Sequence, residues 1–512
     1  MKKETLSDAI GNISDEKIEQ AKGKHKNILK FTVKQWVALA ACIALAITAV
    51  FGIPKLIPHT PTPTDVSTTV SDEPSQDVTD EPTTKKPQAV MLAHQVAAAN
   101  YDDIPYYDNW LPDEEDLEIA KTVKGISENS FTKEINSFLG KANGENAVFS
   151  PAALYIALSV LAELTDGDSR QQILDFLDVP DTAALRENVR AMIASVYEYH
   201  VVGDEMPEEY RGVLGIMRPA TSLWLGNNTG VKLSDDVKNA LENNFLASLF
   251  NGDLSDEEYQ NKYREWVREY TGGVYGEEEA LTNIFTLVNS LLYAHKWQYP
   301  FRAENNFSGV FHTPGGDVQT EYMFSNGYEV EMVDYYEGSN FEAVNWDGGA
   351  WFILPKEGYT INDVLKKDAY NELLNALRND EIKPYDRDFI YAVQLTLPKF
   401  DISSDMDLKS ELKSFGVTDV FSDKASFGGL LDEQTGKSLQ GLPVLTAVQE
   451  NRMVVNEEGI AAVSFGKIDG GSGPAENIKY INMVLDRPFI TMVASDEGLP
   501  LFTAVVNNPQ KS

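Results

Sequence analysis

Cysteine is nearly absent from this sequence. Cys42 is the only one in 512 residues, so no disulfide can form within the chain. The six histidines include neither a His-Glu-x-x-His motif nor paired ligands at metal spacing, and we therefore predict no metal and no cofactor. Basic residues number 43 against 79 acidic ones, which gives a net charge of −36. Without a basic stripe to neutralise phosphates, nucleic acid is excluded as a partner.

Catalytic motifs are also missing. The chain has no Gly-x-Ser-x-Gly nucleophile elbow, and the few histidines leave no persuasive set of serine, base and acid. The many carboxylates could include a glycosidase pair, but in a chain this acidic any two carboxylates are more typical of a solvated surface. Gly470-Gly-Ser-Gly473 lacks the lysine and the strand–helix context of a phosphate loop. We therefore expect the protein not to be an enzyme.

Only one long hydrophobic run stands out. Residues 36–53 carry no charge and are just long enough to span a bilayer, so we predict a signal-anchor helix at 35–53. Five lysines between positions 22 and 34 precede it, which by the positive-inside rule places a polar tail, residues 1–34, in the cytoplasm. The sequence thus predicts a single-pass protein of the cell membrane, held through 35–53, with its C-terminal part outside.

Other interpretations of this run fit less well. A cleaved signal peptide would have a shorter positive region and a small-residue cleavage site. Leu39-Ala-Ala-Cys42 imitates a lipoprotein box, but here the apolar stretch follows the box instead of preceding it. A buried helix of a soluble domain is disfavoured by the proline- and threonine-rich tract that comes next.

The remaining chain divides by composition. Residues 54–88 are rich in proline, threonine, serine and aspartate and lack aromatic residues, so they cannot offset their ordering entropy and should form a disordered stalk. Residues 89–117 are an N-terminal extension whose aromatic residues indicate packing but show no period. The globular domain is predicted to occupy residues 118–512, where helical and strand patterns alternate as in an α+β fold.

The most informative stretch lies near the C-terminal end. Val454-Val-Asn-Glu-Glu-Gly-Ile-Ala-Ala-Val-Ser464 starts as a β-strand, passes an acidic turn and continues with small and β-branched residues that are themselves strand-competent. Gly470-Gly-Ser-Gly-Pro474 cannot hold a regular element, so the chain from Gly459 to about Lys479 is predicted to be an exposed, flexible connection. Loops of this length in a compact domain are usually functional or disordered.

Several motifs resemble the serpin family. Val455-Asn-Glu-Glu-Gly459 with the small residues after it resembles the serpin hinge, and Leu485-Asp-Arg-Pro-Phe-Ile490 with Leu501-Phe-Thr-Ala-Val-Val-Asn-Asn-Pro509 resembles the C-terminal signature. Asn146-Ala-Val-Phe-Ser-Pro151 resembles the start of the family's central buried helix, with Ser150 as N-cap and proline at the first helical position. Leu287-Val-Asn-Ser-Leu-Leu-Tyr-Ala-His-Lys-Trp297 resembles the third strand of its main sheet. The resemblance covers residues 118–509.

This resemblance implies the architecture. We expect an α+β fold with a large mixed central β-sheet, further sheets, about eight or nine helices and an exposed reactive-centre loop near the C-terminus. The positions at which the sheet would open are Ser150, Asn289, Trp297 and Gln449. Gln449 stands where the family usually has a histidine that hydrogen-bonds to the region of the buried helix and to the mid-sheet asparagine. A glutamine amide can both donate and accept there.

The resemblance also implies a mechanism. A target serine protease would cleave the loop and form a covalent acyl-enzyme, and the loop upstream of the cut would insert into the central sheet of a monomeric inhibitor. Phe465 and Gly466 are less typical of the family and could slow insertion. The hinge residues in this assignment are Glu457, Glu458, Gly459, Ile460, Ala461, Ala462, Val463 and Ser464.

The bond that is cut is less well defined. Family spacing counted from Gly459 reaches Gly473, whereas spacing counted back from Pro488 reaches Asn477. The small neutral residues favour an elastase- or subtilisin-like target, and Lys479 would suit a trypsin-like one. The candidates are Ser472, Gly473, Ala475, Asn477, Ile478 and Lys479. Two alternatives remain open for the whole protein: a non-inhibitory surface binding protein with the serpin fold, and a cysteine-protease inhibitor that uses the same loop.

Overall fold

The structure is a computed structural model of the chain, and it does not describe every residue. The described residues are 90–91, 119–126, 137–140, 142, 144–196, 198–202, 212–270, 280–297, 301–325, 333–346, 349–379, 381–382, 390–457, 459–461, 478–495 and 497–511. They all belong to one unit, formed by Thr84–Ala97 and Pro105–Ser512. Within these residues no helix is long and apolar enough to cross a membrane. The predicted tail, anchor and stalk lie outside the described residues.

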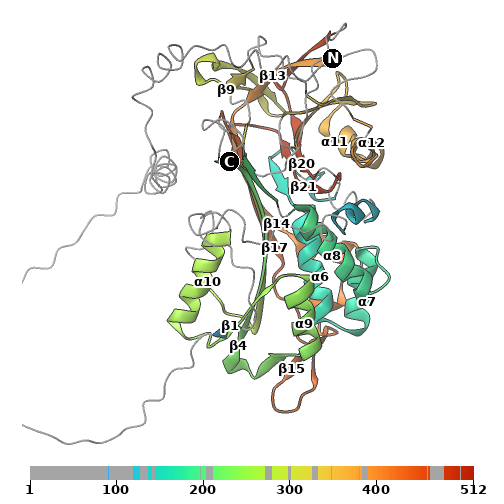
Figure 1. Cartoon of the computed structure of the whole chain (residues 1–512), viewed down its shortest axis with the longest axis vertical. Coiled ribbons are helices and arrows are strands. Elements are labelled where there is room, and N and C mark those ends of the chain that lie inside the picture. The colour runs from blue at the N-terminus through green and yellow to red at the C-terminus, as the bar shows by residue number, and fades with distance from the viewer. Residues whose placement is uncertain are drawn as a thin grey trace, which may run out of the picture. The chain divides into compact units, whose positions relative to one another are not determined.

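An eight-stranded mixed sheet, called the central sheet below, organises the domain (Figure 1). Its order is β1-β6-β4-β7-β18-β17-β14, with β3 paired to β4. The pairing of β4 with β6 is parallel, and the other ladders are antiparallel. The strands are β1 (Val90–Met91), β3 (Glu198–Val202), β4 (Gly212–Gly226), β6 (Ser248–Gly252), β7 (Phe285–Lys296), β14 (Phe400–Asp407), β17 (Val448–Val455) and β18 (Gly459–Ala461).

Three smaller sheets accompany the central sheet. The six-stranded sheet has the order β10 (Tyr335–Glu337), β11 (Phe341–Asn345), β12 (Ala350–Pro355), β20 (Phe489–Ala494), β21 (Pro500–Val506) and β2 (Ala147–Phe149). The four-stranded sheet has the order β19 (Ile478–Val484), β13 (Ile390–Pro398), β9 (Gly316–Phe324) and β8 (Phe307–Thr313). The three-stranded sheet has the order β16 (Ser438–Gln440), β15 (Ser426–Asp432) and β5 (Val231–Leu233).

Helices cover the sheets. In Figure 1, α10 lies on one side of the central-sheet strands and α6 to α9 lie on the other, while α11 and α12 lie beside β20. The helices are α6 (Pro151–Leu164), α7 (Gly167–Phe176), α8 (Thr182–Val196), α9 (Asp235–Asn244), α10 (Glu257–Tyr270), α11 (Ile361–Leu365), α12 (Lys367–Arg378) and α13 (Leu408–Ser414). The α+β fold with a large mixed central sheet is therefore as predicted.

Helix α6 begins where the sequence predicts it. The Ser150 side chain accepts a hydrogen bond from the Ala153 amide at 3.2 Å, and Pro151 occupies the first turn. Nearly all of its side chains are buried, because the helix packs between the central sheet and its neighbouring helices. Ser150 also donates its hydroxyl to the Leu501 carbonyl at 2.7 Å, which attaches the helix start to β21.

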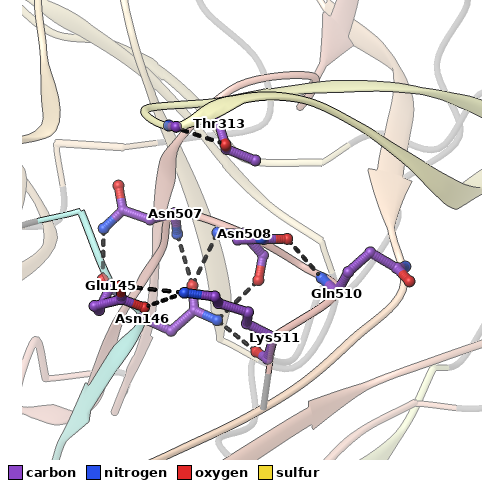
Figure 2. Close-up of polar contacts among 8 residues, drawn as sticks. Glu145, Asn146, Thr313, Asn507, Asn508, Gln510 and Lys511 are labelled. Carbon is purple, nitrogen blue, oxygen red and sulfur yellow. Dashed lines mark hydrogen bonds and ion pairs between the residues drawn. The ribbon is translucent and has the colours of Figure 1, made fainter.

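The C-terminal end of the chain is joined to the residues just before β2. The Asn146 side chain accepts from the backbone amides of Asn507 and Asn508, each at 2.9 Å, and donates to the Asn508 and Lys511 carbonyls (Figure 2). Lys511 also pairs with Glu145 at 2.8 Å. The Asn-Asn pair of the C-terminal motif thus positions β2, and β2 in turn leads into Ser150.

Candidate functional site

The acidic turn predicted as the hinge lies between β17 and β18. The Asn456 amide donates to the Gly459 carbonyl at 3.0 Å, and the Gly459 amide donates to the Asn456 side chain at 3.2 Å. Contacts from outside also hold the backbone of this turn: Trp297 donates its indole N–H to the Asn456 carbonyl at 2.8 Å, and the Phe301 amide donates to the Glu457 carbonyl at 3.1 Å. Glu458 lies outside the described residues.

The chain after the turn does not leave the sheet at once. Val455 pairs with Ile460 on one side, and on the other side Ile460 pairs with His295 of β7. The prediction of an exposed connection starting at Gly459 is therefore wrong for β18. The physical reason is that Ile460 is only 2% exposed, and burying a side chain of this size stabilises by about 1.5–3 kcal/mol. Ala462, Val463 and Ser464 lie outside the described residues.

β18 separates two strands that are otherwise unpaired with each other. Among the described strands, β7 pairs with β4 and β18, and β17 pairs with β14 and β18, but no ladder joins β7 directly to β17. β18 is antiparallel to both. A chain that continued β18 past Ala461 would therefore run along both strands toward their N-terminal ends.

Glu457 is the charged group of the hinge. Its carboxylate is 2.9 Å from the Lys399 ammonium and accepts a hydrogen bond from Asn306, while Lys399 is also 2.9 Å from Glu321. Burial by itself disfavours ionisation of Glu457, but hydrogen bonds, chiefly from Lys399, lower its pKa overall. Burial likewise opposes the charge on Lys399, and its bonds to Glu457 and Glu321 outweigh this and raise its pKa. This network joins the hinge to β9 and to the start of β14.

Trp297 anchors the turn between β17 and β18 through its buried indole ring. Its side chain is 2% exposed and meets Phe301 edge to face, with ring centroids 6.2 Å apart. Phe301 in turn stacks on Trp346 at 5.3 Å. The indole N–H therefore reaches Asn456 from a ring that packing holds in place.

Side chains of the central sheet bind the backbone of β2 and of Ser150, the residue directly after it. Gln449 accepts from the Ser150 amide and donates to the Ser150 carbonyl, each at 2.9 Å. Ser404 of β14 does the same for Val148, accepting from its amide at 2.9 Å and donating to its carbonyl at 2.7 Å. β2 is the edge strand of its sheet, so these side chains replace the backbone partners that it lacks. We call the two pairs the β2 latch.

Asn289 lies at mid-height on β7 and is not part of the β2 latch. It donates to the Thr221 hydroxyl at 2.9 Å, and its own side-chain oxygen is buried without a hydrogen-bond partner in the described structure. Gln449 instead receives a hydrogen bond from Asn451 at 3.0 Å. The glutamine therefore contacts the start of the buried helix but makes no direct bond to the mid-sheet asparagine.

The candidates for the cut bond divide into two groups. Ser472, Gly473, Ala475 and Asn477 lie outside the described residues. Ile478 and Lys479 begin β19 and pair in parallel with Ile390 and Tyr391 of β13. The prediction that the exposed connection runs to about Lys479 is thus wrong by two residues, because the apolar and β-branched residues that follow it pair with a neighbouring strand.

Comparison with known proteins shows which family has this arrangement. The family model "Serpin (serine protease inhibitor)" matches residues 127–509. The chain belongs to the serpin family. Neuroserpin of Mus musculus is 23% identical over 402 residues, which cover 73% of this chain and 89% of neuroserpin. An alpha-1-antitrypsin-like protein of Tamias sibiricus is 27% identical over 392 residues, covering 72% of this chain and 84% of that protein.

Solved structures show the same fold. The native state of the thermophilic serpin tengpin matches with a TM-score of 0.59 at 22% identity, covering 82% of this chain and 100% of tengpin. Serpins in general inhibit serine proteases and are not enzymes. No group of three or more His, Cys, Asp or Glu side chains that could hold a metal occurs among the residues described for this serpin.

Several residues of this serpin's site were missed by sequence reasoning. Lys399, Asn306 and Ser404 stand in segments with no hinge signal of their own. Lys399 lies directly before β14 in Gln394-Leu-Thr-Leu-Pro-Lys-Phe400, and only the pairing of β14 with β17 brings it to Glu457. An isolated lysine next to a strand gives no signal of its partner.

Proposed function

We propose that this serpin is a suicide-substrate inhibitor of a serine protease of the elastase or subtilisin type. The observation that supports this most directly is β18, a three-residue strand between β7 and β17 that ends at Ala461, just before the loop predicted from the sequence. Cleavage in the loop would free the chain after Ala461 to extend this strand. Extension gains ladder hydrogen bonds on both sides and drags the acyl-linked protease with it.

The register of β18 says where each residue would go. Continued without a shift, it places Ala462 beside Met453 and Gly466 between Asn289 and Gln449. The β17 residues on the side of Ile460 are the buried ones, Met453 and Val455, so Ala462, Ser464 and Gly466 would face the core. These are small side chains, and a core that is already close-packed accepts little more.

The same register assigns the less typical Phe465 to the opposite face. It would lie beside Ser290, whose hydroxyl donates to the Tyr270 carbonyl at the end of α10 at 2.7 Å. Its bulk would therefore meet α10 and not the core. We infer that Phe465 slows insertion without preventing it. In a fraction of the encounters with protease, the acyl-enzyme would then hydrolyse before the loop inserts, and the serpin would be cleaved without forming a complex.

We also propose that the serpin domain acts outside the cell. The apolar run at 36–53, the lysines before it and the proline-rich stretch at 54–88 support a membrane anchor followed by a stalk. Such an arrangement would hold the inhibitor at the cell surface and at a distance from the bilayer.

The test is incubation of the full chain with an elastase, a subtilisin, a trypsin and, for the cysteine-protease alternative, a papain-type enzyme. We expect a complex that resists denaturing electrophoresis with one of the serine proteases, and mass spectrometry of the released C-terminal peptide would locate the bond. Complete cleavage by every enzyme without a complex would contradict inhibition. It would favour the non-inhibitory surface protein, above all if the cleaved form melts at the same temperature as the intact one.

A further inference from the structure

The strand that follows the reactive loop presents an unusual outward surface. Tyr480 is 71% exposed and Ile478 is 47% exposed, although both are large and apolar or aromatic. They stand two residues apart on β19 and so point to the same face of the four-stranded sheet. Neighbouring exposed apolar groups mark sites of protein–protein contact more often than single scattered ones do. We call Ile478 and Tyr480 the β19 surface.

The opposite face of β19 explains why the strand is held firmly. Met483 is 1% exposed and Ile481 packs against the core. Lys479 lies 5.5 Å from the centre of the Tyr391 ring and 4.0 Å from the Glu337 carboxylate. The strand is therefore fixed by its inward residues, and its outward residues are presented on a rigid element.

We propose that the β19 surface is a docking element for the target protease, on the C-terminal side of the cut bond. This deepens the proposed function and rests on it. The argument is continuity: no residue separates the loop from β19, so a protease that holds the loop is bound beside this strand. From the candidate bonds at Ser472 to Asn477, Tyr480 is three to eight residues away, at most about 10 to 30 Å of extended chain. A standard interface of about 800 Å² per partner extends over such a distance.

The partner chemistry follows from the residues. An exposed tyrosine and isoleucine on a flat strand favour a protease whose surface next to its leaving-group subsites is apolar, because aromatic side chains on rigid elements dominate interface energetics. Insertion takes place in the central sheet, whereas β19 belongs to the four-stranded sheet. The β19 surface should therefore determine how fast the complex forms and not how often insertion succeeds.

The experiment uses the full chain in detergent with the protease that forms the covalent complex. Tyr480→Ala is compared with Tyr359→Ala, a control at a side chain that is 50% exposed in the turn before α11. We expect Tyr480→Ala to lower the second-order rate of complex formation about tenfold. The fraction of cleavages that end in complex should stay unchanged, as should the melting temperature, and Tyr359→Ala should change nothing.

Three outcomes would overturn this proposal in distinguishable ways. An unchanged rate in Tyr480→Ala with normal complex formation would remove the docking role and leave inhibition intact. A dimer of the wild-type chain that Tyr480→Ala dissociates would make the β19 surface a contact between two copies of this chain. A wild-type chain that forms no complex with any protease would remove the proposed function together with this inference.

Discussion

Glu457 links the hinge to a different sheet through Lys399, which also binds Glu321. The pKa of Glu457 is lowered and the pKa of Lys399 is raised, and together these shifts define the pH range in which both groups are charged. A lowered carboxyl pKa stabilises the fold above the ordinary value of 4.5 and loses this effect as the pH falls through the lowered value. A raised lysine pKa stabilises below the ordinary value of 10.5 and loses this effect as the pH rises through the raised value. The ion pair between Glu457 and Lys399 therefore stabilises the fold fully between about pH 4.5 and pH 10.5.

Glu457→Gln removes the charge and keeps the shape. Between pH 5 and 9 we expect it to lower the stability of the native form by about 1–3 kcal/mol, because hydrogen bonds to charged groups contribute in this range. The difference from wild type should shrink as the pH falls through the lowered pKa of Glu457, where the wild-type carboxylate also becomes protonated. Thermal melting at each pH measures this, with Glu433→Gln at an exposed position as the control. A difference that does not shrink anywhere between pH 4.5 and acid unfolding would contradict the assignment.

Ser404 tests the β2 latch. Ser404→Ala leaves the amide and carbonyl of the buried Val148 without their partner, which costs about 1–3 kcal/mol. The neighbouring Ser403→Ala changes a side chain on the other face of β14 and should cost less than 0.5 kcal/mol, about the usual effect of a surface substitution. Urea unfolding of the two variants provides the measurement. Equal effects would mean that the latch adds no stability.

At the scale of elements, β18 decides which loop residues face the core. Its pairing with β17 makes Ile460, Ala462 and Ser464 the inward series and Ala461, Val463 and Phe465 the outward one, if the register continues. The loop residues therefore divide into core-facing and outward-facing positions, and each kind can be tested by its own substitution.

Ala462→Arg and Val463→Arg form a matched pair for this test. The first would bury a charge without a partner on insertion, so we expect cleavage to proceed and the covalent complex to be lost. The second would place the charge on the outward face and should preserve most of the complex. Densitometry of the complex and cleaved bands measures both variants. Equal loss in the two single variants would exclude the continued register.

Helices α6 and α8 are joined by a buried ion pair. Arg186 contacts both oxygens of Glu163 at 2.6 and 2.7 Å, and the exposed fractions of the two side chains are 35% and 2%. The carboxylate is therefore the group that cannot reach water if its partner is removed.

This difference in exposure predicts that removing Arg186 costs more stability than neutralising Glu163. Arg186→Met should lower the free energy of unfolding by about 3 kcal/mol, because it leaves a buried charge without compensation. Glu163→Gln retains an acceptor for an arginine that is partly in water, and it should cost less. Thermal or urea unfolding of the two variants decides between them. A larger loss in Glu163→Gln would show that the charge of the glutamate stabilises the helix pair by more than the cost of leaving that charge without a partner.

At the scale of the whole molecule, the central sheet reaches into the N-terminal extension. β1 pairs antiparallel with β6, Val90 with Asn251 and Met91 with Phe250. β6 would otherwise be the edge of the sheet, and edge strands with free backbone groups exchange and associate readily. The segment that precedes the domain thus caps the sheet into which the loop is proposed to insert.

Removing this segment gives the prediction at this scale. Compared with residues 84–512, a chain of residues 98–512 should show faster amide hydrogen exchange in β6, Ser248–Gly252, and unchanged exchange in the buried sheet strand β20. The reason is the loss of backbone partners along one edge only. Identical exchange in β6 for the two chains would show that β1 adds no protection.

The sequence by itself determined the features that depend on neighbours along the chain. Ser150 and Pro151 start a helix through local capping, and the apolar run after them predicts its burial. The hinge and the C-terminal signature are contiguous motifs, so they identified the family and the α+β fold. The tertiary structure alone decided that Ser404 binds Val148, 256 residues away, and that Lys399 binds Glu457. It also decided that β18 extends the sheet to Ala461 and that β19 begins at Ile478. These depend on which strands become neighbours, and burial between two strands outweighs the local preference of glycine and small residues for a loop.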